Sequence, residues 1–305
     1  MIEAGYILGG LWVFALGATV GSFANVCIYR IPFQKSLIWP GSHCPRCYSA
    51  ISARDNVPVL GWILLGGRCR SCSLPIPARY PLIEFLSGAL FVAVYFAELV
   101  YGGLEPKDFS RAGYHFLLIS FLIVATFIDY DYRIIPDAIT VTGMIVGLGL
   151  GTLMPWARPS PLEATTAWEG FRIGITGLLV GGGIIWAIRI FGRILFRKEA
   201  MGFGDVTLMA MIGSFLGWQI LPPAVFLAVL LGLIEPLVKS VRMLWILIVH
   251  GKFRPVDSEI PFGPYLSMAS LLLTLGWPWV WKSFLANYYR QLGEAASFLW
   301  GAVGG

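Results

Sequence analysis

Asp205 is the residue of this sequence with the clearest chemical signature. It ends the stretch Gly202-Phe203-Gly204-Asp205, directly before an apolar segment from 206 to 218. A carboxylate at the edge of a membrane helix is energetically costly, so its presence there indicates a function. Because glycine has no Cβ, Gly202 and Gly204 would let the backbone of a bound peptide come close to this carboxylate. We therefore predict that both glycines position a substrate.

Asp129 is the expected partner of Asp205. It closes an apolar run from 117 to 128, where a carboxylate has little structural purpose. Two carboxylates a few ångströms apart do not both ionise easily, so one of them keeps its proton. The ionised aspartate can then draw a proton from water while the protonated one polarises a peptide carbonyl. The pair predicts an aspartic peptidase whose dyad titrates as a unit, so the shared proton is assigned to neither residue.

Three further carboxylates near these positions have more ordinary interpretations. Asp131 fits a solvated turn between two spans, and Asp137, which follows Pro136, is expected to cap the next helix. Glu84 lies just inside the start of another apolar segment. It either interacts favourably with that helix N-terminus or lines the site and positions the substrate, and both interpretations stay open.

Four cysteines are spaced as metal ligands in the one insertion that reads as soluble. They form the pairs Cys44-Pro-Arg-Cys47 and Cys69-Arg-Ser-Cys72. Each pair presents two thiolates to one tetrahedral metal, and the spacing is close to that of zinc ribbons. Two disulfides are the alternative, which a reducing cytoplasmic compartment disfavours. We predict a structural zinc ion held by all four thiolates.

The composition is that of a polytopic membrane protein. Of the 305 residues, 57% are hydrophobic and 13% are charged, whereas soluble domains carry about 25% charged residues. A spanning helix needs about 20 apolar residues. We predict an all-α protein of about eight transmembrane helices, at 6–26, 82–101, 113–129, 138–154, 172–195, 205–219, 221–246 and 265–286.

These spans divide the chain into four segments. The segments are a first transmembrane helix (1–32), a cytoplasmic zinc-binding loop (33–80), a transmembrane catalytic bundle (81–286) and a C-terminal interfacial tail (287–305).

The first helix has small and polar residues suited to packing against another helix. Gly17 and Gly21 would let a second helix approach closely, and Asn25 could hydrogen-bond across the bundle.

The distribution of basic residues predicts the orientation in the membrane. If the cysteine loop is cytoplasmic, sixteen of the 22 lysines and arginines lie on the cytoplasmic side. The positive-inside rule then places both termini outside. In this topology the third span ends, and the sixth begins, at the cytoplasmic membrane edge. Asp129 and Asp205 are therefore expected to meet there, although 76 positions separate them.

Six motifs in this order resemble the type IV prepilin peptidase family, the bifunctional leader peptidases and N-methyltransferases of pilus and type II secretion systems. They are Gly21-Ser-Phe-Ala-Asn25, the two cysteine pairs, Arg79-Tyr-Pro-Leu-Ile-Glu84, Ile128-Asp-Tyr-Asp131 with Ile135-Pro-Asp137, Met201-Gly-Phe-Gly-Asp205 and Pro261-Phe-Gly-Pro264. The resemblance covers nearly the whole chain and implies that Asp129 and Asp205 are the catalytic pair. It further implies a bacterial inner-membrane enzyme that cleaves prepilins or pseudopilins after a glycine on the cytoplasmic side. Methylation of the new N-terminal residue from S-adenosylmethionine is the second implied activity.

Other functions remain open from the sequence. The protein could be a peptidase without methyltransferase activity, a secondary transporter, or an adaptor that uses only the zinc loop. No repeated halves with interrupted helices support a transporter. No glycine fingerprint of a dinucleotide-binding fold is present, so the S-adenosylmethionine site is unassigned. The expected partners are the precursor substrates and membrane lipid; a basic cytoplasmic face explains the net charge of +5 without nucleic acid.

Overall fold

The computed structural model describes residues 2–101, 104–159, 164–197, 201–250 and 261–280, together with Ser283. In these ranges the chain is helical, and no strand forms; two isolated bridges occur in the cysteine loop. The predicted all-α class is confirmed. The tail predicted at 287–305 lies outside the described residues.

Eight long helices build the described part of the bundle. They are α1 (Ile2–Arg30), α3 (Arg79–Val94), α4 (Pro106–Tyr132), α5 (Asp137–Leu153), α6 (Ala167–Phe196), α7 (Phe203–Leu216), α8 (Leu221–His250) and α9 (Gly263–Val280). The shorter elements are η1 (Ile31–Phe33), η2 (Ala53–Asp55), α2 (Leu60–Leu64), the π-helical η3 (Tyr95–Val100) that continues α3, η4 (Pro155–Ala157) and η5 (Trp218–Ile220).

Each predicted apolar stretch coincides with one of these helices, and the last is described only to 280. Within the described residues, five helices are long and apolar enough to cross a membrane: Ala4–Phe33, Arg79–Val100, Pro106–Tyr132, Ala167–Leu195 and Trp218–Val241. Helices α5 and α7, with 17 and 14 residues, are shorter than an independent span requires. The prediction of about eight spans is therefore confirmed only for these five candidates.

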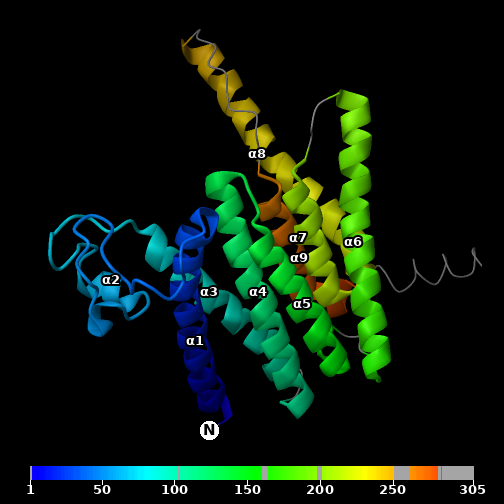
Figure 1. Ribbon diagram of the computed structural model, residues 1–305, viewed down its shortest axis with the longest axis horizontal. Helices are drawn as coiled ribbons and strands as arrows, with labels where there is room; N and C mark the ends of the chain where they lie inside the picture. The colour runs from blue at the N-terminus through cyan, green and yellow to red at the C-terminus, as the bar shows by residue number, and fades with distance from the viewer. Residues whose placement is uncertain are drawn as a thin grey trace, which may run out of the picture.

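The helices lie side by side and alternate in direction along the chain (Figure 1). Helices α1, α4 and α6 finish at one end of the bundle, where α5, α7 and α9 begin. We call this the loop end, because the cysteine loop leaves the bundle from the end of α1. The other end holds the N-terminus (Figure 1).

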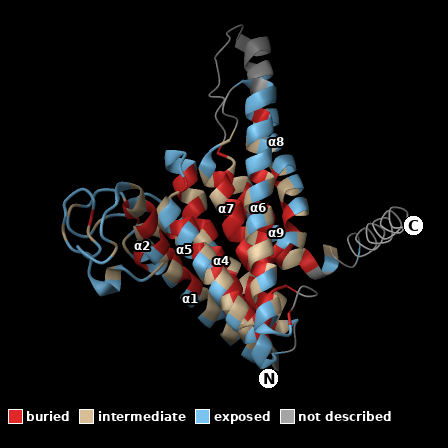
Figure 2. Ribbon diagram, turned by 45° about the vertical axis from the view of Figure 1, so that its right-hand side comes forward, coloured by how far each residue is buried: buried red, intermediate tan, exposed pale blue. Residues whose placement is uncertain are grey.

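Helix α7 lies inside the bundle, packed against α5, α6 and α9. Its residues from Leu208 to Leu216 are all buried, as Figure 2 shows. Contact with α6 is between backbones, because a Cβ on Gly213 would overlap the backbone oxygen of Gly177. A helix enclosed by other helices has no lipid layer to span. This explains why α7 can be short and still present its first turn at the loop end.

The packing of α1 against α3 follows the sequence prediction. A Cβ on Gly17 would come within 2.8 Å of a backbone oxygen of α3, and one on Gly21 would lie 2.8 Å from the Cα of Glu84. The side-chain amide of Asn25 donates a hydrogen bond of 3.1 Å to the backbone oxygen of Tyr80. The predicted close approach and the hydrogen bond across the bundle are both confirmed.

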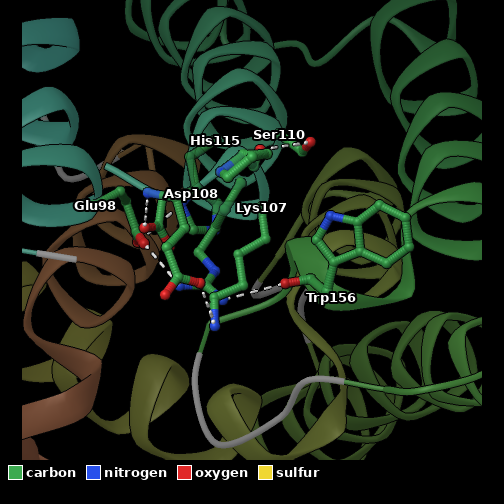
Figure 3. Close-up of polar contacts among 9 residues, drawn as sticks. Glu98, Lys107, Asp108, Ser110, His115 and Trp156 are labelled. Carbon is green, nitrogen blue, oxygen red and sulfur yellow. Dashed lines mark hydrogen bonds and ion pairs between the residues drawn. The ribbon is translucent and has the colours of Figure 1, made fainter. Parts of the chain in front are cut away.

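A buried charged cluster ties the helices together at the end opposite the loop (Figure 3). Glu98 in η3 lies 3.2 Å from the Nδ1 of His115 and 3.5 Å from the guanidinium of Arg111, both in α4. Arg111 also lies 3.5 Å from Asp108 and donates to the backbone oxygen of Trp156. The cluster joins the end of α3, the start of α4 and the segment after α5.

Candidate active site

Asp129 and Asp205 line the same cavity at the loop end of the bundle. Asp129 is in the last turns of α4 and Asp205 is in the first turn of α7, and their exposed fractions are 6% and 7%. The cavity has a volume of about 400 Å³. The prediction that the topology brings these two aspartates together is confirmed.

Two buried carboxyl groups on one cavity can share a proton. Burial and mutual repulsion both disfavour a state in which each carries a negative charge. One carboxylate can then act as a general base while its protonated neighbour donates a hydrogen bond. The remaining residues of the cavity wall are Arg133, Ile134, Ile135, Met201, Gly202, Phe203, Gly204, Pro261 and Phe262.

A backbone donor from α9 holds Asp129. The N–H of Gly263 donates a hydrogen bond of 3.1 Å to its Oδ2. A Cβ on Gly263 would lie only 2.6 Å from that oxygen, so only glycine lets the backbone come this close. The sequence indicates the Pro261–Pro264 motif but no role for Gly263 in the site. Glycine at position 263 is what permits the short distance to Asp129. The hydrogen bond itself comes from a backbone N–H, which every residue except proline has.

The two glycines before Asp205 have different surroundings. A Cβ on Gly204 would lie 2.9 Å from the Cβ of Ile135, so this glycine allows α7 to pack against the connection between α4 and α5. A Cβ on Gly202 would have Asp205 Oδ2 as its nearest neighbour, at 3.7 Å, an ordinary contact distance. Gly202 therefore leaves open space beside the carboxylate, while Gly204 is required by packing.

The other predicted acidic residues lie outside this cavity. Asp131 is within α4 rather than in a turn between helices, and its carboxylate pairs with Arg79. Its placement in a turn is wrong, because α4 continues to Tyr132, but the predicted exposure to solvent is confirmed. Glu84 lines a second cavity, between the cysteine loop and helices α1 and α3.

The predicted capping role of Asp137 is also wrong. Helix α5 begins at Asp137 itself, and Pro136 occupies the N-cap position without a side-chain hydrogen bond. Asp137 is exposed in the first turn. A carboxylate there still interacts favourably with the helix dipole, although it accepts no capping hydrogen bond.

The four cysteines of the loop converge on one point. Their Sγ atoms all lie within 4.8 Å of one another, with 4.0 Å between Cys44 and Cys72 and between Cys47 and Cys69. A tetrahedral site with Zn–S bonds of about 2.3 Å places the sulfur atoms about 3.8 Å apart, so the separations fit zinc. A disulfide would need about 2.05 Å. All four thiols are free, and the disulfide alternative is excluded.

The two cysteine pairs form turns of the same design. The N–H of Cys44 donates to Ser49 O, and the N–H of Tyr48 donates back to Cys44 O. In the second turn Cys69 donates to Leu74 O and Ser73 donates to Cys69 O. Each turn is closed by one isolated bridge, His43 with Ala50 and Arg68 with Pro75. Such paired turns present two thiolates each, which is the arrangement of a closed structural metal site.

An ion pair fixes the part of the loop between these turns. Nε and Nη2 of Arg70 donate to the two carboxylate oxygens of Asp55 at 2.7 and 2.6 Å. This two-point contact lowers the pKa of Asp55 to about 2. The pair connects the second cysteine turn to η2.

Comparison with known proteins agrees with this arrangement. Residues 15–97 match the model of the bacterial peptidase A24 N-terminal domain, and residues 116–237 match that of the type IV leader peptidase family. No solved structure matches the chain.

The curated relatives cover most of the chain. A prepilin leader peptidase/N-methyltransferase of Myxococcus xanthus is 31% identical over 94% of this chain and 96% of its own length. A type 4 prepilin-like proteins leader peptide-processing enzyme of Escherichia coli is 34% identical over 84% and 89%. A prepilin leader peptidase/N-methyltransferase of Aeromonas hydrophila is 32% identical over 90% and 93%. On this identity and coverage, the chain belongs to the type IV leader peptidase family.

Proposed function

We propose that this chain cleaves the leader of type IV prepilins or pseudopilins with Asp129 and Asp205, and then N-methylates the new N-terminal residue. Family membership and the names of the relatives support the two activities. One observation carries the assignment of the residues: two buried aspartates from separate helices line a single cavity. Buried carboxyl groups at a membrane edge are costly unless they have a function.

The aspartate pair performs the cleavage as a dyad that shares one proton. The ionised carboxylate takes a proton from a water molecule, and the resulting hydroxide equivalent attacks the scissile carbonyl carbon. The protonated carboxyl donates a hydrogen bond to the carbonyl oxygen as it gains negative charge. The hydrogen bond from Gly263 fixes the orientation of Asp129 during this step.

The substrate must reach the dyad as an extended backbone. The open space beside Gly202 is where a peptide can pass close to Asp205. Phe203 and Phe262 supply apolar surface on the same wall. This arrangement suits a segment that leaves a membrane helix and unwinds at its end.

The proposed location is the bacterial inner membrane, with all eight helices in the membrane and the loop end facing the cytoplasm. The sixteen basic residues assigned to the loop-end side support this orientation through the positive-inside rule. The short helices α5 and α7 are in the membrane as parts of the bundle. Thiols engineered at the exposed residues 104–107 should react with an impermeant reagent from outside, and thiols at the exposed residues 202–203 should not. The reverse labelling would place the dyad in the wrong compartment.

The zinc ion that the cysteine spacing and the sulfur geometry both indicate would be held by Cys44, Cys47, Cys69 and Cys72. Zinc would supply a structural cross-link between the two turns and no step of the cleavage. The loop has few buried apolar residues of its own, so such a cross-link would stabilise it strongly.

The test of the dyad is a cleavage assay on purified Asp129→Asn and Asp205→Asn variants. Each should lower the rate by about 10²–10⁴-fold or more, the range expected when a general acid or base is lost. Asp137→Asn, an exposed aspartate in the adjacent helix, is the matched control and should cleave normally. Near-normal cleavage by either dyad variant would overturn the assignment.

The second activity is measured separately on a peptide that already begins at the mature N-terminus. Both dyad variants should still transfer a labelled methyl group to it, because methyl transfer depends mainly on positioning of donor and amine. Equal loss of both activities in a folded variant would mean that one site serves both. Absence of methyl transfer by the wild type would restrict the proposal to the peptidase.

A further inference from the structure

A second cavity lies between the cysteine loop and helices α1 and α3. Its volume is about 350 Å³, within the range of small-molecule sites. Every residue of its wall falls between Ser22 and Glu84, and none belongs to the cavity of the two aspartates. It therefore lies entirely within the part of the chain that matches the N-terminal family model, residues 15–97. The dyad residues lie in the part that matches the peptidase model, residues 116–237.

The wall combines aromatic rings with one carboxylate that has no ion pair. Trp62, Tyr29 and Tyr80 contribute the rings. Of the two carboxylates, Asp55 is already held by Arg70. Within the described residues, Glu84 forms no salt bridge. The wall also contains Arg30, Arg54 and Arg70. Arg30 donates to the backbone oxygens of Ser36 and Pro40, and Arg70 is paired with Asp55, so Glu84 is the acidic group of the wall that is left for a bound cation.

Glu84 is held in place by the loop that covers the cavity. The backbone N–H of Val59 donates a hydrogen bond of 2.7 Å to its Oε2. Val59 has a φ of 61°, which is a strained conformation for a β-branched residue. Strain of this kind persists only where the surrounding structure holds the backbone firmly, so the loop position against Glu84 is well defined.

We propose that this cavity binds the methyl donor S-adenosylmethionine, with Glu84 facing its positive charge. The inference rests on the proposed methyltransferase function and names a site for it. The donor carries a sulfonium and an ammonium group, which a carboxylate favours, and a purine base, which aromatic rings favour. Two activities in the relatives' names thereby correspond to two cavities in two separately matched parts of the chain.

The transfer is balanced without any further reactant. The lone pair of the substrate amine forms a bond to the methyl carbon, and the bond between carbon and sulfur breaks. Its electron pair stays on sulfur, which becomes a neutral thioether, and the methylated ammonium loses a proton to water. The contribution of this chain is to bind and orient the donor, since positioning accounts for much of the acceleration in such steps.

The experiment measures binding of S-adenosylmethionine and of its neutral product, S-adenosylhomocysteine, to the full chain in detergent by equilibrium dialysis. Glu84→Gln keeps an acceptor for the Val59 N–H and removes the charge. It should weaken S-adenosylmethionine binding about tenfold, the size expected for one contact to a charged group, and weaken S-adenosylhomocysteine binding less. Val26→Trp, which fills the cavity from α1, should abolish binding of both.

Controls separate this inference from the proposed function. Glu235→Gln removes a half-buried carboxylate on α8 that lies outside the cavity, and it should bind both compounds like the wild type. Leader cleavage by the Val26→Trp variant should continue, which shows that the bundle is folded. Absence of binding by the wild type would refute the methyltransferase function itself. Wild-type binding together with unchanged binding by Glu84→Gln and Val26→Trp would refute only this location.

Discussion

Arg79 and Asp131 form a two-point ion pair that joins the first residue of α3 to the last turn of α4. Nη1 of Arg79 donates to Oδ1 at 2.7 Å and Nη2 donates to Oδ2 at 2.5 Å. The guanidinium also lies over the ring of Phe127, 5.4 Å from its centre. Arg79 is the neighbour in sequence of Tyr80, which lines the cavity between the cysteine loop and helices α1 and α3. Asp131 lies two positions after Asp129, which lines the cavity of the two aspartates. The pair thus connects the helix that borders one cavity with the helix that carries the proposed dyad.

This pairing predicts that Asp131 supports the structure without taking part in cleavage. The Asp131→Asn variant should cleave at a rate within a few-fold of the wild type. Because Arg79 is 40% exposed, the pair should contribute only about 0.5–1 kcal/mol to the free energy of unfolding. A double-mutant cycle with Arg79→Ala and Asp131→Asn, read by thermal unfolding, measures this coupling. A loss of cleavage as large as that of Asp129→Asn would show that the carboxylate at 131 acts in the chemistry.

Gly263 should be sensitive to a single added methyl group. In Gly263→Ala the new Cβ would lie 2.6 Å from Asp129 Oδ2, so the carboxylate must move and its hydrogen bond is weakened. We expect cleavage to fall at least about tenfold, because small displacements of a reacting group are costly in rate. Gly276→Ala is the matched control. Gly276 is in the same helix, and a Cβ added there would have no neighbouring atom within 4 Å. Equal activity of the two variants would show that the Gly263 contact has no role in positioning Asp129.

The aspartate pair could be predicted from the sequence, whereas its support could not. Alternating spans place Asp129 and Asp205 at one membrane edge whatever the details of packing. Gly263 lies 134 positions from Asp129 and acts through its backbone, so no residue pattern indicates the hydrogen bond. The sequence leaves two interpretations of Glu84, because the surroundings of this side chain depend on how the cysteine loop folds back onto the helices. The sequence does not indicate that α5 begins at Asp137, because Pro136, with its fixed φ, takes the N-cap position itself.

Purified protein should contain about one zinc ion per chain, bound by the four cysteines. Changing Cys47 and Cys69 to serine should release it, since one ligand is then lost from each turn. Metal content by atomic absorption and protease sensitivity of 33–80 provide the two readouts. Cys27→Ser, which alters a buried cysteine in α1, should keep its zinc. A metal-free wild type with a protease-resistant loop would refute the site.

Acid should release this zinc before it disrupts the ion pair beside it. Thiolate ligands take up protons as the pH falls, so zinc affinity drops with it. The pKa of Asp55 is about 2 in the folded loop, below the value of about 3.9 for an unfolded aspartate. Its pairing with Arg70 therefore stabilises the loop fully above pH 4 and is lost only as the pH falls toward 2. Loop opening between pH 7 and 5, followed by proteolysis with and without added zinc, should thus depend on zinc. Asp55→Asn can loosen the loop at every pH in this range, but the pH at which acid opens it should be the same as in the wild type.

The last prediction concerns the buried cluster around Glu98. Its carboxylate faces Arg111 and His115, whose side chains are 8% and 1% exposed. Glu98→Ala leaves these groups without their shared acceptor, and breaking a buried pair by removing one partner costs about 3–5 kcal/mol. Thermal unfolding should therefore occur at a clearly lower temperature, and Glu98→Gln, which keeps an acceptor, should fall between this variant and the wild type.

Lys107→Ala is the control for this cluster, because its ion pair with Glu105 is about half exposed and lies at the start of the same helix. It should change the free energy of unfolding by less than about 1 kcal/mol. Below its unfolding temperature Glu98→Ala should still cleave substrate, since Arg111 and Asp129 are 18 residues apart in α4, about 27 Å along the helix. If Glu98→Ala unfolded at the same temperature as Lys107→Ala, the cluster would not stabilise the contacts between these helices. Loss of cleavage in the folded variant would instead connect this end of the bundle to the dyad.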